Sequence, residues 1–217
     1  MADAYSTQET QMYRPRPMPD REKYQHAFGM VRLYQKHVLP FIDERLGYAA
    51  VHELSSVWQA AIIPIHEGDS DQKKYESAYS NWLWMARCSH DFLADLLKQD
   101  EVAEYKRLLM QLHTHQHDNS DLAIYRMFGN HTALAKSWLY EMQWMTPIEL
   151  TTKSNAQFTC IVQDCKILQT PATERICRVD CRNVGTVMAR KVYHLKRVTT
   201  AVDHGCTITL TPLEDDD

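Results

Sequence analysis

Residues 81–97 read NWLWMARCSHDFLADLL, and this stretch decides the fold of the first two-thirds of the chain. Small and apolar side chains recur in it at spacings of three and four, the period of an α-helix with a buried face. These side chains are Trp82, Met85, Ala86, Ser89, Leu93, Leu96 and Leu97. Trp84, Cys88 and Phe92 form a second apolar stripe. We therefore predict a helix that is buried around most of its circumference.

The same spacing predicts further helices on both sides of this stretch. One begins at Asp20 and ends or kinks at Pro40, where the proline removes a backbone donor. A second spans 48–63, and later apolar sets predict helices that end before Pro147. The region 19–147 is thus predicted to be a helical lobe.

Beyond residue 147 the pattern changes from helical spacing to alternation, which indicates strands. Residues 158–163 alternate in this way, and 193–200 and 206–211 read as two further strands joined by 201–205. In the last strand every second side chain is apolar, as expected where one face of a sheet is buried. Those side chains are Cys206, Ile208 and Leu210.

A helix is predicted between these strands. Thr170 and Pro171 resemble an N-cap followed by proline at the first helical position, and the helix would span 172–190. The segment 148–213 is then a cysteine-rich α+β lobe, and the proline-containing residues 1–18 read as a flexible arm. The expected fold class is α+β, in one domain: a helical N-terminal lobe packed on a small C-terminal antiparallel sheet with one helix.

Composition places the chain among ordinary globular proteins. Its 217 residues are 44% hydrophobic and 24% charged, with a formal net charge of −4 and dispersed Lys and Arg. That charge pattern disfavours nucleic acid as a partner. No apolar stretch reaches the roughly 18 residues that span a bilayer, and the first residues do not resemble a signal peptide. We expect a soluble, cytoplasmic protein that takes a small-molecule substrate or ligand; a homo-oligomer is compatible with the sequence.

Five of the six cysteines fall between Cys160 and Cys206. In the cytoplasm they are more plausible as free thiols, metal ligands or catalytic groups than as disulfides. Cys177 and Cys181 lie one turn apart on one face of the predicted helix, with Asp180 about 100° away. The pair fits a nucleophile with a helper, or two thiols of a core face, because free cysteine is often buried. A zinc knuckle fits poorly, since the chain has no Cys-x-x-Cys pair.

Two other pairs of polar residues are relevant to a possible site. Cys206 follows His204 at a predicted turn, where the imidazole could activate the thiol or simply be an exposed turn residue. His90 and Asp91 fall within the most buried helix, so they need hydrogen-bonding partners.

The chain has only six glycines and contains no Gly-rich phosphate loop and no Gly-x-Ser-x-Gly elbow.

A histidine cluster, LHTHQHD at 112–118, raises the alternative of a metal site. In one helix His113, His117 and Asp121 would be spaced i, i+4 and i+8, and would offer two imidazoles and a carboxylate to a transition metal. The following residues 118–121 are rich in N-cap types, which favours a polar loop between two helices instead. The sequence is compatible with both the metal site and the polar loop.

The last part of the chain contains four features in a fixed order. They are a strand, a helix with Cys177, Asp180 and Cys181, the stretch LKRVTT at 195–200, and HGCTI at 204–208. This order resembles the C-terminal part of the L-2-amino-thiazoline-4-carboxylic acid hydrolase-like family. A looser likeness links it to 4-vinyl reductase-type small-molecule-binding domains. The resemblance implies an α+β fold, a bacterial origin, and either ring-opening hydrolysis of a small cyclic amidine or binding of a small hydrophobic ligand.

We therefore expect a hydrolase-like, small-molecule enzyme of bacterial specialised metabolism that requires no cofactor. Cys177 or Cys181 would attack or position the substrate, Asp180 or His204 would act as acid or base, and Cys206 is a further candidate thiol. One alternative is a non-catalytic binding or sensor module. The other is a metalloenzyme that uses the histidine cluster to hold a transition metal.

Overall fold

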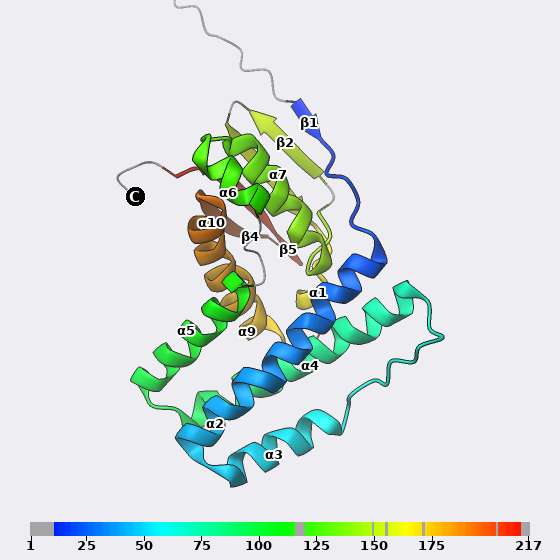
Figure 1. Cartoon of the computed structure of the whole chain (residues 1–217), viewed down its shortest axis with the longest axis vertical. Coiled ribbons are helices and arrows are strands. Elements are labelled where there is room, and N and C mark those ends of the chain that lie inside the picture. The colour runs from blue at the N-terminus through cyan, green and yellow to red at the C-terminus, as the bar shows by residue number, and fades with distance from the viewer. Residues whose placement is uncertain are drawn as a thin grey trace, which may run out of the picture.

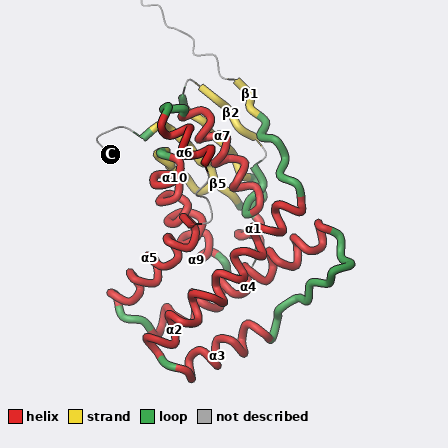
Figure 2. The backbone as a smooth tube through the Cα atoms, viewed as in Figure 1, coloured by secondary structure: helices red, strands yellow, loops and turns green. Residues whose placement is uncertain are grey.

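The computed structural model describes residues 11–115, 120–148, 150–154, 156–170, 172–202 and 204–213, without the side chains of 112–115, 120 and 150. Helices make up most of it, and a small antiparallel sheet lies at one end (Figure 1, Figure 2). The predicted α+β class is confirmed. None of the described helices is long and apolar enough to cross a membrane.

The helical part is built on α1 and α4, which pack along each other (Figure 1). α4 buries about half of the stretch 81–97, whereas Leu96 of the predicted apolar face is exposed. The helix begins at the N-cap Ser70, whose side chain accepts a hydrogen bond from the Lys73 N–H. The elements up to residue 144 are α1 (Asp20–Leu33), η1 (Tyr34–Val38), α2 (Leu39–Leu46), α3 (Tyr48–Gln59), α4 (Asp71–Leu96), α5 (Gln99–His115), α6 (Ser120–Met127), α7 (His131–Glu141) and η2 (Met142–Trp144).

Pro40 does not end the first helix, contrary to one of the two predicted outcomes. The chain passes from α1 into α2 through η1, a single stretch of π-helix, with helical backbone angles throughout. A proline ring crowds the carbonyl of the preceding turn and offers no N–H to it. The wider π turn accommodates both effects, and it places Tyr34 in the core.

The sheet has five antiparallel strands in the order β1-β2-β3-β5-β4. They are β1 (Gln11–Tyr13), β2 (Leu150–Ser154), β3 (Gln157–Val162), β4 (Leu195–Val202) and β5 (Gly205–Pro212). The three predicted strands correspond to β3, β4 and β5, whereas β1 and β2 were not predicted. β1 lies in the expected flexible arm: Met12 pairs with Thr152 of β2, and Met18 is buried.

The predicted helix before β4 is longer and begins later than expected. It starts at Glu174, not at 172, and runs through α9 (Glu174–Ile176), η3 (Cys177–Val184) and α10 (Gly185–Tyr193). Thr173, not Thr170, is its N-cap, and a short helix α8 (Lys166–Gln169) precedes it. Pro171 lies outside the described residues.

This composite helix joins the two parts of the molecule. α10 packs on β4, and α7 packs on β4 and β5, so helices cover one face of the sheet (Figure 1). At its other end α9 contacts α4, and η3 contacts α5. η3 lies between these contacts, and its side chains reach both the core and the surface. π segments occur frequently at functional sites.

Candidate functional site

η3 has one face in the core and one against a surface cavity. Asp180 and Cys181 point inward and are almost completely buried, with exposed fractions of 1% and 5%. Cys177, Arg178 and Arg182 line the cavity. Cys177, Asp180 and Cys181, which the sequence places on one helix, are therefore close in the chain, but their side chains lie on different sides of the helix.

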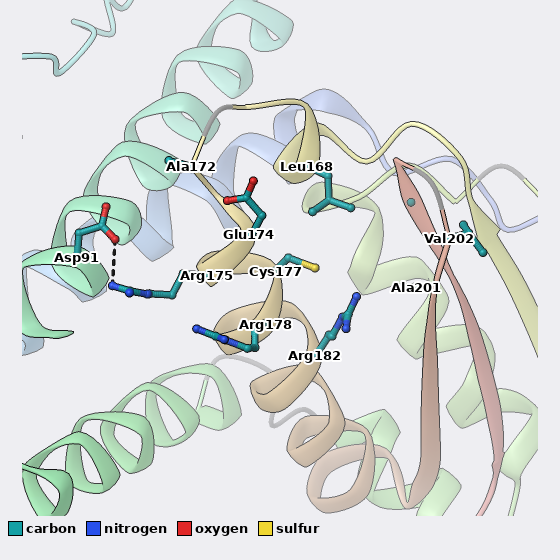
Figure 3. A pocket seen from close by; sticks show the side chains of 11 residues that line it. Asp91, Leu168, Ala172, Glu174, Arg175, Cys177, Arg178, Arg182, Ala201 and Val202 are labelled. Carbon is teal, nitrogen blue, oxygen red and sulfur yellow. Dashed lines mark hydrogen bonds and ion pairs between the residues drawn. The ribbon is translucent and has the colours of Figure 1, made fainter.

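The cavity beside Cys177 has a volume of about 590 Å³, within the usual range of small-molecule sites. α9 and η3 form one wall, and Leu168 and the β4–β5 hairpin form the opposite wall (Figure 3). The Cys177 sulfur is turned toward Leu168 and lies on the same side as Arg182, whereas Arg175 and Arg178 point toward Asp91. We call this space the Cys177 cavity.

The arginines around the Cys177 cavity differ in their partners. Arg175 donates hydrogen bonds to the Asp91 carboxylate at 3.1 Å and to the His90 carbonyl at 2.9 Å, which ties α9 to α4. Arg178 and Arg182 form no ion pair with any carboxylate in the described part of the chain. The Nε of Arg182 is also buried without a hydrogen-bond partner there. A guanidinium in this state is suited to an anionic ligand.

The Cys177 thiol is largely shielded from water. Burial raises its pKa and the neighbouring Cys181 adds to that effect, while the Arg182 guanidinium opposes it through its charge and a hydrogen bond. Only the thiolate is a strong nucleophile. In the absence of ligand, Cys177 is therefore a weak nucleophile near neutral pH.

On the inner side of η3, four polar side chains form a closed network. The Asp180 carboxylate lies 2.7 Å from Nε2 of His90 and accepts a hydrogen bond of 3.2 Å from the Tyr34 hydroxyl. The Tyr105 hydroxyl lies 3.4 Å from Nδ1 of His90. Burial, and then the charge of Asp180, raise the pKa of both tyrosines well above the usual range, so both stay neutral donors. The partner that the sequence required for His90 is Asp180.

Arg197 of β4 is the second buried ionic group on the inner side. Its guanidinium donates hydrogen bonds to the carbonyl of Cys181 and, at 3.6 Å, to the sulfur of Cys181. It also lies 5.2 Å from the ring centroid of Trp138, a cation–π arrangement. Gly185 leaves the space for it, because an added Cβ there would meet the Arg197 guanidinium.

Three further cysteines, Cys160, Cys165 and Cys206, are buried in the core near Cys181, whereas Cys88 lies half-buried on α4. The pKa of Cys160 and the pKa of Cys206 are both raised to about 12, mainly by burial, and the charge of Arg197 opposes the shift in both. All six cysteines are free thiols. In the described part of the chain no group of three His, Cys, Asp or Glu residues could hold a metal ion. These thiols fill the core between η3 and the sheet.

Several predicted site residues are separated from the Cys177 cavity. His204 is exposed in the hairpin with a left-handed φ of 54°, and its carbonyl accepts a hydrogen bond from the Cys165 N–H at 3.1 Å. Cys206 faces the core from β5, and Asp180 is engaged by His90 and Tyr34. The structure therefore brings no carboxylate or imidazole of the predicted set to Cys177.

The histidine cluster falls largely outside the described residues. His117 lies outside them, and so does the side chain of His113, whose backbone belongs to α5. α5 ends at His115 and α6 begins at Ser120, so His113 and Asp121 belong to separate helices. Asp121 is exposed. The metal-site hypothesis depends on residues between α5 and α6 that lie outside the described part of the chain, so it stays a prediction.

Two features of the site were not predicted from the sequence. The His90–Asp180 pair joins positions far apart in the chain, and only the burial expected of His90 pointed to a partner. The arginines at 175, 178 and 182 follow helical spacing and could have been recognised as one stripe. No family model, no curated protein and no solved structure matches the chain.

Proposed function

We propose that the protein binds a small anionic molecule in the Cys177 cavity. The observation that carries this proposal is Arg182, whose guanidinium borders a cavity of about 590 Å³ without a carboxylate partner among the described residues. A planar guanidinium matches a carboxylate or phosphate in geometry, and such charge-assisted hydrogen bonds are stronger than neutral ones.

The cavity also favours a ligand that carries a positive group. Asp91 and Glu174 line it together with the arginines, so both signs of charge are available. The family resemblance implies a cyclic amidine as substrate, and L-2-amino-thiazoline-4-carboxylate combines an amidine with a carboxylate. It is therefore the probe of choice: its carboxylate would pair with Arg182, and its amidine would face the thiol.

Calorimetric titration with this probe tests the binding proposal. We expect Arg182→Gln to weaken binding by about tenfold, the equivalent of one lost charge-assisted hydrogen bond. Arg190→Gln removes an exposed arginine of the same composite helix that does not line the cavity, and it should leave binding unchanged. No binding by the wild-type chain to this probe, or equal loss in both variants, would overturn the proposal.

Hydrolysis of the bound molecule is a second candidate function, favoured by the orientation of the Cys177 sulfur into the cavity (Figure 3). The thiolate would add to the amidine carbon, and the ring bond from that carbon to its leaving heteroatom would break. That heteroatom would take up a proton. Water would then cleave the new carbon–sulfur bond and regenerate the thiol, so the product is heavier than the substrate by one water.

Mass spectrometry of the reaction mixture tests hydrolysis directly. Turnover should vanish in Cys177→Ala while binding of the probe persists, and Cys181→Ala should retain turnover because its sulfur faces Arg197. If the triple alanine variant at Cys177, Cys181 and Cys206 still turned the probe over, thiol chemistry would be excluded. Binding without turnover in the wild-type chain would favour the binding or sensor module.

A further inference from the structure

A second cavity lies on the other flank of the composite helix, between α4, α5 and η3. Its volume is about 460 Å³, and it is separate from the Cys177 cavity except that Arg175 and Arg178 border both. Its lining consists of an apolar wall, a set of cations, the neutral Asn183 and the two inner residues His90 and Tyr105. We call this space the His90 cavity.

The apolar wall comes from the end of α4, the start of α5 and one residue of η3. It consists of Leu93, Ala94, Leu97, Val102 and Val179. Leu93 is buried, whereas Leu97 and Val102 remain partly exposed. Such a wall stabilises a bound hydrocarbon chain by removing its methylene groups from water.

The cations of the His90 cavity have no acidic counterpart in its lining. Lys106, Arg175 and Arg178 line it, and no Asp or Glu does. Arg175 is engaged by Asp91, but neither Lys106 nor Arg178 has a carboxylate partner in the described part of the chain. The cavity therefore offers two cations next to an apolar surface.

We propose that the His90 cavity is a binding site for an amphipathic carboxylate, a molecule with one anionic head and a medium-length hydrocarbon tail. The head would pair with Lys106 and Arg178, and the tail would lie along Leu97 and Val102. The ligand contacts the outer surface of the His90–Tyr105 pair, so its presence is reported by the His90 ring. This site lies beyond the proposed function of the Cys177 cavity and does not depend on it.

Decanoate is the probe for this site, with acetate and decanol as comparisons. Acetate has the head without the tail, and decanol has the tail without the charge. We expect decanoate to bind about tenfold more tightly than either, because acetate lacks the apolar contact with the wall and decanol lacks the charge that pairs with Lys106 and Arg178. Calorimetry measures the affinities, and NMR should show a shift of the His90 ring signals with those of the exposed His52 unchanged.

Variants separate the His90 cavity from other sites. The double variant Lys106→Gln/Arg178→Gln should weaken decanoate binding by about tenfold or more, and Val102→Asp should weaken it independently by placing a charge on the apolar wall. Arg107→Gln is the matched control, because Arg107 neighbours Lys106 but pairs with Glu104. Cys177→Ala and Arg182→Gln should leave decanoate binding intact, so failure of the first proposal is distinguishable from failure of this one.

Three results would overturn the proposal. The first is no measurable binding of decanoate to the wild-type chain. The second is binding that shifts His52 as much as His90, or that survives the double cation variant and Val102→Asp, which means adsorption elsewhere on the surface. The third is equal affinity for decanoate and decanol, which means that the cations do not recognise the head.

Discussion

The charged groups on the two sides of η3 differ in whether they have a partner within the described part of the chain. On the inner side Asp180 is held by His90 and Tyr34, and Arg197 is held by Cys181 and the face of Trp138. On the cavity side Arg182 has no carboxylate partner in the described part of the chain. Both sides belong to one π segment of eight residues.

This difference separates polar groups that are paired within the fold from one that is available to a ligand. A buried ionic group costs free energy unless it is paired, so the inner network is expected to support the fold. An arginine without a carboxylate partner at a cavity can take one from a ligand. The carboxylate that the sequence favoured as an acid or base, Asp180, is paired within the fold, whereas Arg182 is the group that we propose binds a ligand.

The largest predicted effect follows from breaking the inner network. Asp180→Ala leaves His90 and Tyr34 buried without their acceptor, and we expect a loss of about 3–5 kcal/mol in the free energy of unfolding. Asp91→Ala removes a half-exposed carboxylate that pairs with Arg175 on the cavity side, and it should cost less than about 1 kcal/mol. Urea denaturation of both variants measures the difference, and equal losses would contradict the distinction between the two sides.

A smaller loss is predicted where β4 meets η3. In Gly185→Ala the added Cβ overlaps the Arg197 guanidinium, which is fixed by Trp138 and by the Cys181 carbonyl. We expect a loss of about 1–3 kcal/mol from overpacking. Gly68→Ala, with open space at the Cβ position, is the control and should change stability little. An unchanged midpoint of thermal unfolding in Gly185→Ala would show that Arg197 is not held there.

The reactivity of the thiols toward an alkylating reagent should also distinguish the two sides of η3. The experiment uses the Cys88→Ser variant, which lacks the half-buried thiol of α4. Burial raises the pKa of Cys160 and the pKa of Cys206 to about 12, and it also raises the pKa of Cys177, whose thiol lines the cavity. We expect iodoacetamide to modify Cys177 first, at a rate that rises with pH beyond the ordinary thiol range near 8.5. Peptide mapping by mass spectrometry identifies the site, and prior modification of Cys160 or Cys206 would contradict this order.

The same raised values predict a pH dependence of stability. For Cys160 and Cys206 the pKa in the folded state exceeds the pKa in the unfolded state. At a pH between these two values the folded chain therefore binds more protons than the unfolded chain. The contribution of these two thiols to the free energy of unfolding is complete below about pH 8.5 and is lost as the pH rises toward 12. The unfolding free energy should therefore fall in alkaline solution, and the fall should be shallower in a double Cys160→Ala/Cys206→Ala variant measured by urea denaturation.

The smallest effect on stability is expected at the cavity itself. Arg182→Gln removes a charge without a carboxylate partner among the described residues, so the unfolding free energy should change by less than about 0.5 kcal/mol. Differential scanning calorimetry checks this. A large loss would mean that Arg182 supports the fold, and its proposed role toward a ligand would then lose its basis.

Regular periodicity in the sequence predicted the main elements well. The stripe in 81–97 identified α4, and alternation identified β3, β4 and β5, because each element has a face that must be buried. β1 and β2 escaped because they are short and partly exposed, and β1 forms only by pairing with a strand far along the chain. Local pattern contains no information about that partner.

The candidate site was only partly accessible from sequence. Spacing correctly grouped Cys177 and Cys181 on a helix, but it assumed ideal α geometry, whereas the segment is a π helix. Cys177 lines the cavity, whereas Cys181 contacts Arg197 of β4. That difference depends on which elements pack beside each thiol, and spacing along the chain does not contain it. The link between His90 and Asp180 depends on tertiary packing of α4 against the composite helix.

The most direct test of the account compares ligand binding across the two sides of η3. L-2-amino-thiazoline-4-carboxylate is titrated by calorimetry into the wild-type chain, Arg182→Gln and Asp180→Asn, the last a near-isosteric change on the inner side. We predict that Arg182→Gln weakens binding by about tenfold with stability preserved, and that Asp180→Asn lowers stability while the folded fraction binds as the wild type does. Loss of binding in folded Asp180→Asn, with Arg182→Gln unaffected, would contradict the account.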